Sequence, residues 1–257
     1  NEDEYGYLYP SLNDPQFNIK ITERREFYDT RYDGKIHNVK EQSDILCNAE
    51  FELAPHQLFV RNFLSFQTPY NSLLLYHGLG TGKTCSAISV SEEMRDYLNQ
   101  MGIAQRIIVV ASPNVQDNFK LQLFDDRKLR LVDGLWNIKT CTGNKFLKEI
   151  NPMNMKGLSK ERVISQIKSI IRSSYLFLGY TEFANFISKK SSIGSDIKGP
   201  KRRAAIIKTK LKRYFNNRLI IIDEVHNIRI TDDNKDKRVA TELFKLVEAV
   251  DNLRLLF

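Results

Sequence analysis

The hydrophobic and polar positions along the chain follow two patterns in turn. Short apolar runs occur at 73–76, 107–111, 138–141, 175–178, 219–222 and 253–257, and such runs are typical of buried strands in a parallel sheet. Helical periodicity fills the stretches at 83–100, 159–172 and 237–250. This alternation of strand and helix predicts an α/β fold, with a mostly parallel sheet and helices on both faces.

Two of the predicted helices carry a continuous apolar face. In the helix at 159–172 this face consists of Val163, Ile164, Ile167, Ile170 and Ile171. In the helix at 237–250 we expect the inward face to consist of Val239, Leu243, Phe244, Val247 and Val250. Faces of this kind predict helices that pack against a core.

The first 50 residues do not share this alternation. They combine Pro, Asp and Asn with aromatic side chains at Tyr5, Tyr7, Tyr9, Phe17, Phe27, Tyr28 and Tyr32. We therefore predict an irregular N-terminal extension over residues 1–50 that packs on the domain through its aromatic side chains. Residues 51–257 are predicted to form a single lobe.

The composition excludes several classes of protein. Hydrophobic residues make up 42% and charged residues 27% of the 257 positions, as in ordinary globular proteins. The longest apolar runs hold about five residues, whereas a membrane-spanning helix needs roughly 20, so we expect no membrane segment. The N-terminus also lacks the pattern of a signal peptide.

The three cysteines, Cys47, Cys85 and Cys141, are odd in number and widely spaced, with no CxxC pair. This arrangement argues against a disulfide framework or a zinc site and favours a reducing intracellular compartment. Cys85 directly follows Thr84, where a thiol could make nucleotide binding sensitive to thiol reagents. The simpler interpretation is a small apolar residue in the first turn of a helix.

The positive charge is concentrated in one segment. The whole chain has a formal charge of +8, yet residues 188–218 alone carry eleven bases against one acid, Asp196. Such a concentration is expected where a protein meets phosphate backbones. The alternative is a solvated loop followed by a helix with one charged face.

The segment 72–85, SLLLYHGLGTGKTC, has the pattern of a phosphate-binding loop. An apolar strand leads into a glycine-rich turn, and Lys-Thr opens the next helix, as a P-loop requires. The backbone N–H groups of the turn and of the helix N-terminus would cradle phosphates, and the expected cradle is Gly78, Gly80, Thr81 and Gly82. Lys83 would reach the β and γ phosphates, and the Thr84 hydroxyl would bind Mg²⁺. His77 replaces the first glycine of the strict motif, so an incidental glycine-rich turn is the alternative.

A second strand supplies two carboxylates. Residues 218–226 read RLIIIDEVH, which places Asp223 and Glu224 at the carboxyl end of a buried strand. Ligands of open α/β sheets bind at that edge. Asp223 could then hold Mg²⁺, while Glu224 orients and deprotonates the attacking water, because phosphoryl transfer needs mainly positioning and charge compensation.

Together these motifs resemble helicase superfamily 2, in which a GxGKT loop is followed by DExH. The resemblance implies a RecA-like P-loop NTPase lobe. It also implies that Gln57, in APHQLFVRNF and 26 residues before Lys83, recognises adenine, and that His226 couples the nucleotide state to a second lobe. The segment at 109–119, VVASPNVQDNF, resembles motif Ia, and TCTG at 140–143 resembles the Thr-Gly element that touches a nucleic-acid backbone.

The resemblance narrows to large nucleocytoplasmic DNA viruses. HGLGTGKT, DEVHN and the opening YPSLNDPQFNIKITERREFYDTRYD are similar to viral ATPases such as the small subunit of the poxvirus early transcription factor and the poxvirus nucleoside triphosphate phosphohydrolase I. This implies the ATP-binding lobe of a nucleic-acid-dependent ATPase or helicase-like translocase in viral transcription, with ATP and Mg²⁺ as ligands. DNA or RNA would contact the segment from Lys189 to Arg218, and viral RNA polymerase or transcription factor subunits are possible partners. The expected location is the virion and host cytoplasm, or simply intracellular if the protein is not viral.

The resemblance also defines what the chain lacks. The final run NLRLLF is not followed by Ser-Ala-Thr, and no later arginine-rich motif is present. We therefore expect the first lobe only, with a second lobe absent and with weak or no ATP hydrolysis by this chain alone. Because 140 residues separate Lys83 from Asp223, we also expect a basic insertion at about 144–217.

Two other functions fit parts of the sequence. The chain could be a transcription-complex subunit that uses ATP as a structural switch, although retention of Glu224 argues against a site that does not hydrolyse. It could also be a packaging or AAA-type ATPase without a nucleic-acid role. Gln57 and His226 disfavour that interpretation.

Overall fold

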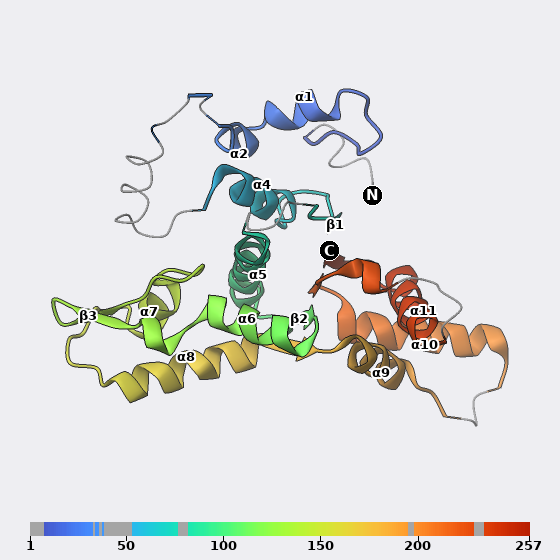
Figure 1. The fold of residues 1–257 in the computed structure, drawn as a ribbon. Coiled ribbons are helices and arrows are strands. Elements are labelled where there is room, and N and C mark those ends of the chain that lie inside the picture. Colours follow the sequence, from blue (N-terminus) through green and yellow to red (C-terminus); the bar gives the residue numbers. More distant parts are fainter. Residues whose placement is uncertain are drawn as a thin grey trace. The chain divides into compact units, whose positions relative to one another are not determined.

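The computed structural model describes residues 8–32, 34–35, 38, 53–76, 82–194, 198–228 and 234–257. The chain divides into two compact units. The first comprises residues 1–70, 76–97 and 119–171, and the second comprises residues 71–75, 98–118 and 172–257. The helices, shown in Figure 1, are α1 (Phe17–Thr22), α2 (Arg25–Tyr28), α4 (Pro55–Phe63), α5 (Lys83–Gln100), α6 (Pro113–Leu123), α7 (Lys145–Ile150), α8 (Lys160–Ser174), α9 (Tyr180–Ser191), α10 (Pro200–Phe215) and α11 (Asn234–Ala249).

The second unit contains a five-stranded parallel sheet. Its strands are β1 (Ser72–Leu73), β2 (Ile107–Val110), β5 (Tyr175–Leu178), β6 (Arg218–Ile222) and β7 (Leu253–Leu256). Their order is β1-β7-β6-β2-β5, and every neighbouring pair is parallel. The predicted α/β fold class is therefore confirmed, and the sheet flanked by helices is consistent with a RecA-like lobe.

The core of this unit explains why its strands lack polar alternation. Ile108, Val110, Ile220 and Ile222 belong to a buried cluster with side chains of α9, α10 and α11, among them Phe183, Leu211, Phe215 and Leu246. The intervening strand residues, Ile107, Val109, Leu219 and Ile221, are buried as well. Because both faces of the strands are covered, apolar side chains are favoured along β2 and along β6 from Leu219 onward.

One predicted strand is wrong. Residues 138–141 form no strand, and a two-stranded antiparallel hairpin precedes them, formed by β3 (Arg130–Val132) and β4 (Leu135–Asn137). Its two-residue turn places Asp133 and Gly134 at positive φ, as tight hairpins prefer. The N–H of Ile138 donates to the side-chain oxygen of Asn144 at 2.9 Å. A side chain thus takes the place of a neighbouring strand at that residue.

The two predicted helix faces had different outcomes. In α8, Val163 and Ile167 are fully buried and the other three apolar residues are half-buried, which confirms the prediction. In α11, Phe244 and Val247 are exposed, whereas Leu246 and Ala249 are buried. The buried face continues through Val239, Leu243 and Leu246. Phe244 lies about 100° around the helix from Leu243, which places it outside this face.

The N-terminal segment, predicted to be irregular, contains the short helices α1 and α2 within its described residues. Its expected packing through aromatic side chains is confirmed. The Tyr70 ring lies edge-on to Tyr9 and Phe17, with centroids 6.0 and 5.7 Å away, and Phe27 contacts Phe59 at 5.0 Å. Among the described residues, no helix combines the length and the apolar character needed to span a bilayer.

Candidate functional site

The end of the predicted phosphate loop is described from Gly82 onward, while Gly78, Gly80 and Thr81 lie outside the described residues. Gly82 has φ +80, a conformation that glycine adopts without strain. The helix α5 begins directly after it, and the N–H of Ser86 donates to the Gly82 carbonyl at 3.0 Å. Lys83 and Thr84 are therefore the first residues of an 18-residue helix, and both side chains are half-buried.

Gln57 lies beside this loop end. Its Nε2 donates to the Gly82 carbonyl at 3.2 Å, and its Oε1 accepts from the Ala54 N–H at 3.0 Å. Gln57 is 7% exposed, so α4 contributes a nearly buried amide to the loop. The structure thus brings together Gln57, Gly82, Lys83 and Thr84 from two segments of the first unit. A second amide hydrogen and a second lone pair of Gln57 have capacity for another partner.

The contact between Gln57 and Gly82 leads to a testable prediction for Gly82→Ala. A Cβ on Gly82 would lie 2.5 Å from Gln57 Nε2, so this nitrogen would have to move and lose its hydrogen bond to the Gly82 carbonyl. We expect a loss of about 1 kcal/mol of unfolding free energy from the positive φ and of about 1 kcal/mol for the displaced hydrogen bond. Urea unfolding would measure this loss.

Gly157→Ala is the matched control for this variant. Gly157 has φ +81, but a Cβ there would meet nothing within 4 Å, so only the backbone strain remains. The double variant Gln57→Ala/Gly82→Ala should recover the part of the loss that the clash causes, as a double-mutant cycle would show. Equal losses for Gly82→Ala and Gly157→Ala would contradict the prediction.

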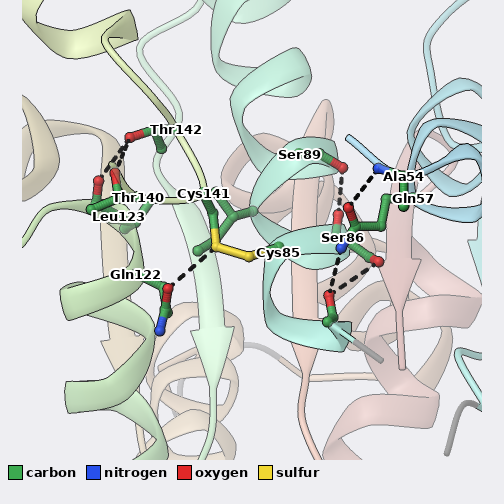
Figure 2. The surroundings of a disulfide bond; sticks show 12 residues. Ala54, Gln57, Cys85, Ser86, Ser89, Gln122, Leu123, Thr140, Cys141 and Thr142 are labelled. Atoms are coloured by element: carbon green, nitrogen blue, oxygen red, sulfur yellow. Dashed lines mark hydrogen bonds between the residues drawn. A yellow bond between two sulfur atoms is a disulfide. The ribbon is translucent and has the colours of Figure 1, made fainter. Parts of the chain in front are cut away.

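The structure corrects the interpretation of the cysteines. Cys85, in the first turn of α5, forms a disulfide with Cys141, as Figure 2 shows. The expectation failed because a disulfide depends on which cysteines the fold brings together. The Cα atoms of these two are 5.3 Å apart across 56 residues of sequence. The bond also removes the basis on which the cysteine count favoured a reducing compartment.

Cys141 belongs to the TCTG element, which forms a tight turn. The N–H of Gly143 donates to the Thr140 carbonyl at 2.9 Å, and Gly143 has positive φ. The Thr142 hydroxyl donates to the Leu123 carbonyl at 2.9 Å and lies 3.1 Å from the Thr140 hydroxyl (Figure 2). Both hydroxyls are thus engaged inside the protein.

The DEVH segment lies at the carboxyl edge of the sheet, as predicted. Strand β6 ends at Ile222, and the N–H of Asp223 donates to the Val110 carbonyl of β2 at 3.0 Å. Asp223 is half-buried, whereas the Glu224 and His226 side chains are 52% and 72% exposed. Nδ1 of His226 lies 3.1 Å from Glu224 Oε2, an exposed contact that adds little stability.

Glu224 has an unusual backbone conformation, with φ 49 and ψ 53. Left-handed conformations cost a non-glycine residue roughly 1 kcal/mol or more and often occur at functional sites. The turn is held by neighbouring groups. The Tyr180 hydroxyl donates to the Asp223 carbonyl at 2.8 Å, and the N–H of Asn227 donates to the Glu224 carbonyl at 2.9 Å.

Sequence reasoning missed Tyr180. It is the first residue of α9, directly after Gly179, whose N–H donates to the Glu182 carboxylate at 2.9 Å. Burial raises the pKa of the Tyr180 hydroxyl, a hydrogen bond with Asn227 opposes this shift, and the charges of Asp223 and Glu224 add to it. The sequence contained a signal for this residue, because Tyr180 closely follows the predicted strand at 175–178. It must therefore lie at the carboxyl edge of the sheet, as Asp223 does.

The topology relates the two predicted motifs through their strands. All five strands are parallel, so the chain leaves β1 toward the glycine-rich segment at the same edge at which it leaves β6 toward Asp223. The segment resembling motif Ia leaves β2 at this edge too, and Gln116 Nε2 donates there to the Ala111 carbonyl at 2.8 Å. The sheet therefore directs three of the predicted motifs to one edge.

Metal binding was predicted for Thr84 and Asp223. Among the described residues, no group of three or more His, Cys, Asp and Glu side chains could hold a metal ion. A hydroxyl and a carboxylate that complete their shell with nucleotide phosphates and water would not form such a group, and oxygen donors of this kind suit Mg²⁺. Thr84 lies in the first unit and Asp223 in the second, and their role in holding Mg²⁺ stays a prediction.

The predicted basic segment includes the C-terminal part of α9 and all of α10 (orange in Figure 1). The side chains of Leu211 and Phe215 are buried on one side of α10. The helix exposes four cations that form no ion pair within the described part of the chain: Lys201, Arg202, Lys208 and Arg213. Arg218 is different, because it is buried in β6, where burial and the neighbouring Arg106 charge lower its pKa to about 10. Arg218 therefore does not belong to the exposed basic surface.

Comparison with known proteins identifies relatives in large DNA viruses. A "Putative ATP-dependent RNA helicase" of Acanthamoeba polyphaga mimivirus is 24% identical over 270 residues, covering 98% of this chain and 22% of the relative. A "Putative helicase" of Invertebrate iridescent virus 3 is 23% identical over 256 residues, covering 97% of the chain and 22% of the relative. The chain resembles helicases of large nucleocytoplasmic DNA viruses. An "Early transcription factor large subunit homolog" of African swine fever virus is 28% identical over 148 residues, which are 54% of the chain and 13% of that protein.

These relatives confirm the resemblance that the motifs indicated, with one difference. The transcription factor match is to a large-subunit homolog, whereas the motifs suggested the small subunit. The chain spans about a fifth of the length of the two helicase relatives. No family model and no solved structure matches the chain.

Proposed function

We propose that this chain is the ATP-binding first lobe of a nucleic-acid-dependent ATPase, a helicase-like translocase that acts in viral transcription. The observation that carries the proposal is the topology of the sheet, because the strands that precede GTGKT and DEVH are parallel and end at the same edge. Phosphate-binding loops and catalytic carboxylates occupy that edge in open α/β sheets. The names of the relatives support helicase-type activity and a role in transcription.

The proposed roles follow the chemistry of each residue. The N–H groups from Gly78 to Gly82 and the N-terminus of α5 would hold the phosphates of ATP, and Lys83 would neutralise charge on the β and γ phosphates. Mg²⁺, held by Thr84 and Asp223, would supply charge neutralisation at those phosphates. Glu224 would orient and deprotonate the attacking water, Gln57 would contact adenine, and His226 would link the site to a second lobe.

The nucleic-acid interface is proposed on the exposed side of α10. Lys201, Arg202, Lys208 and Arg213 lie there without ion-pair partners among the described residues, so they are available for phosphates. The backbone of the TCTG turn would supply a second contact. Viral RNA polymerase or transcription factor subunits are proposed as partners, in the virion and the host cytoplasm.

Replacing all four of these cations by Gln should weaken nucleic-acid binding in a salt-dependent way. Each lost phosphate contact lowers the slope of log K against log salt by about 0.7 to 0.9, so the slope should fall by about 3 for the four together. Fluorescence anisotropy with labelled DNA and RNA over a salt series would measure it.

The control removes the same charge from other exposed positions of the chain, namely Arg25, Lys128, Lys156 and Lys160. If both quadruple variants lower the slope equally, net charge and not the α10 surface attracts nucleic acid. An unchanged slope in the α10 variant would show that nucleic acid binds at another surface of the protein.

The alternative function is an ATP switch in a transcription complex without motor activity. Glu224 disfavours it, since a site that only binds ATP needs no base. Steady-state ATP hydrolysis by the full-length polypeptide that carries this sequence, with and without DNA or RNA, distinguishes the two functions. Strong stimulation of hydrolysis by one nucleic acid supports the translocase function and identifies the nucleic acid on which it acts. ATP binding without stimulated hydrolysis supports the switch. We expect the 257-residue chain alone to bind ATP and to hydrolyse it weakly.

A further inference from the structure

The disulfide joins two elements that the proposed function uses separately. Cys85 is the third residue of α5 and directly follows Thr84, and Cys141 lies inside the TCTG turn. Cys141 is 7% exposed and Cys85 is half-buried. Any displacement of the TCTG backbone is therefore transmitted through one covalent bond to the residue next to the proposed Mg²⁺ ligand.

A second linkage holds the other side of the turn. The helix α7 begins two residues after Gly143, and its Glu149 accepts two hydrogen bonds from Arg95 of α5, at 3.0 and 2.8 Å. Arg95 is 3% exposed and also pairs with Glu92 at 2.8 Å, and Lys145 reaches Asp96 at 2.7 Å. Burial alone would lower the pKa of Arg95, but its hydrogen bonds with Glu149 and Glu92 outweigh burial and raise it. This ion-pair cluster keeps α7 on α5 whether or not the disulfide is present.

We propose that the Cys85–Cys141 disulfide is a redox-controlled link through which nucleic acid bound at the TCTG turn stimulates ATP hydrolysis. Cys85 and Cys141 are positioning residues, because they act through Thr84 and the turn. The inference rests on the proposed function and names a form of regulation of the same site. In the oxidised protein the turn and the start of α5 move as one body, and in the reduced protein the ion pairs of Lys145 and Glu149 with the middle of α5 still connect α7 to that helix.

The chemistry requires a dithiol reductant. One thiolate of the dithiol attacks the protein disulfide and forms a mixed disulfide, and its second thiol then closes a ring. Two electrons and two protons pass to the protein, which is left with two thiols, while the dithiol becomes a cyclic disulfide.

The first measurement is a peptide map under non-reducing conditions after alkylation of free thiols. We expect a linked peptide pair containing Cys85 and Cys141, which disappears after dithiothreitol treatment. Recovery of both cysteines as alkylated thiols from protein purified without reductant would overturn the inference.

The second measurement compares ATP hydrolysis by the oxidised and reduced full-length polypeptide, with and without DNA or RNA. We expect reduction to lower the stimulation by nucleic acid about fivefold or more while the KM for ATP stays the same. Cys85→Ser and Cys141→Ser should show the low stimulation and no response to dithiothreitol, and Cys47→Ser should respond like the wild type. Equal stimulation in both redox states would overturn the inference and leave the proposed function intact. Absence of ATP binding and hydrolysis in both states would instead contradict the proposed function.

Discussion

Lys83→Ala is expected to lower nucleic-acid-stimulated ATP hydrolysis by about 10²- to 10³-fold, the range found when one preorganised group that stabilises transition-state charge is removed. Lys83 is the first residue of α5 and follows Gly82 at φ +80, so its ammonium starts from a fixed backbone position. The proposed role is to neutralise phosphate charge, and alanine provides none. Steady-state hydrolysis by the full-length polypeptide measures the effect.

The control for this variant is Lys160→Ala, at the exposed start of α8 in the same unit. It removes the same charge and should leave hydrolysis unchanged. If Lys83→Ala retains more than a tenth of the wild-type rate, GTGKT is an incidental glycine-rich turn and the proposed function fails. Thermal unfolding of both variants would show whether a loss of rate reflects a loss of fold.

Glu224→Gln is expected to lower the rate of hydrolysis by about 10²- to 10⁴-fold, the usual contribution of a general base. Gln keeps the size of the side chain and its hydrogen-bonding capacity but cannot take a proton from water. Because the carboxylate would act on the attacking water, the Kd for ATP should change little. Single-turnover hydrolysis and equilibrium ATP binding together test this separation.

Glu248→Gln, at an exposed position of α11 in the same unit, makes the same chemical change away from the sheet edge. It should behave like the wild type. A Glu224→Gln variant that hydrolyses ATP normally would show that another group is the base. A variant that loses ATP binding as well would indicate that Glu224 acts on the bound nucleotide and not on water.

The sequence by itself determined the α/β fold, the strands of its parallel sheet and the helices α5, α8 and α11. The strands at 107–110, 175–178, 218–222 and 253–256 and the helix at 83–100 agree with the prediction within one or two residues. The reason is that parallel strands covered on both faces need continuous apolar runs. The carboxyl-edge position of Asp223 followed from the same pattern, since it depends only on where β6 ends.

Only the tertiary structure decided how distant segments meet. The pairing of Cys85 with Cys141, the contact of Gln57 with Gly82 and the bond from Tyr180 to Asp223 join residues between 25 and 56 positions apart. Local patterns carry no information on such contacts, because they depend on how whole elements pack. For the same reason Phe244 and Val247 were wrongly assigned to the inward face of α11 and Arg218 to the basic surface. Periodicity shows that a helix or strand has a buried side, and the surrounding elements decide which residues that side contains.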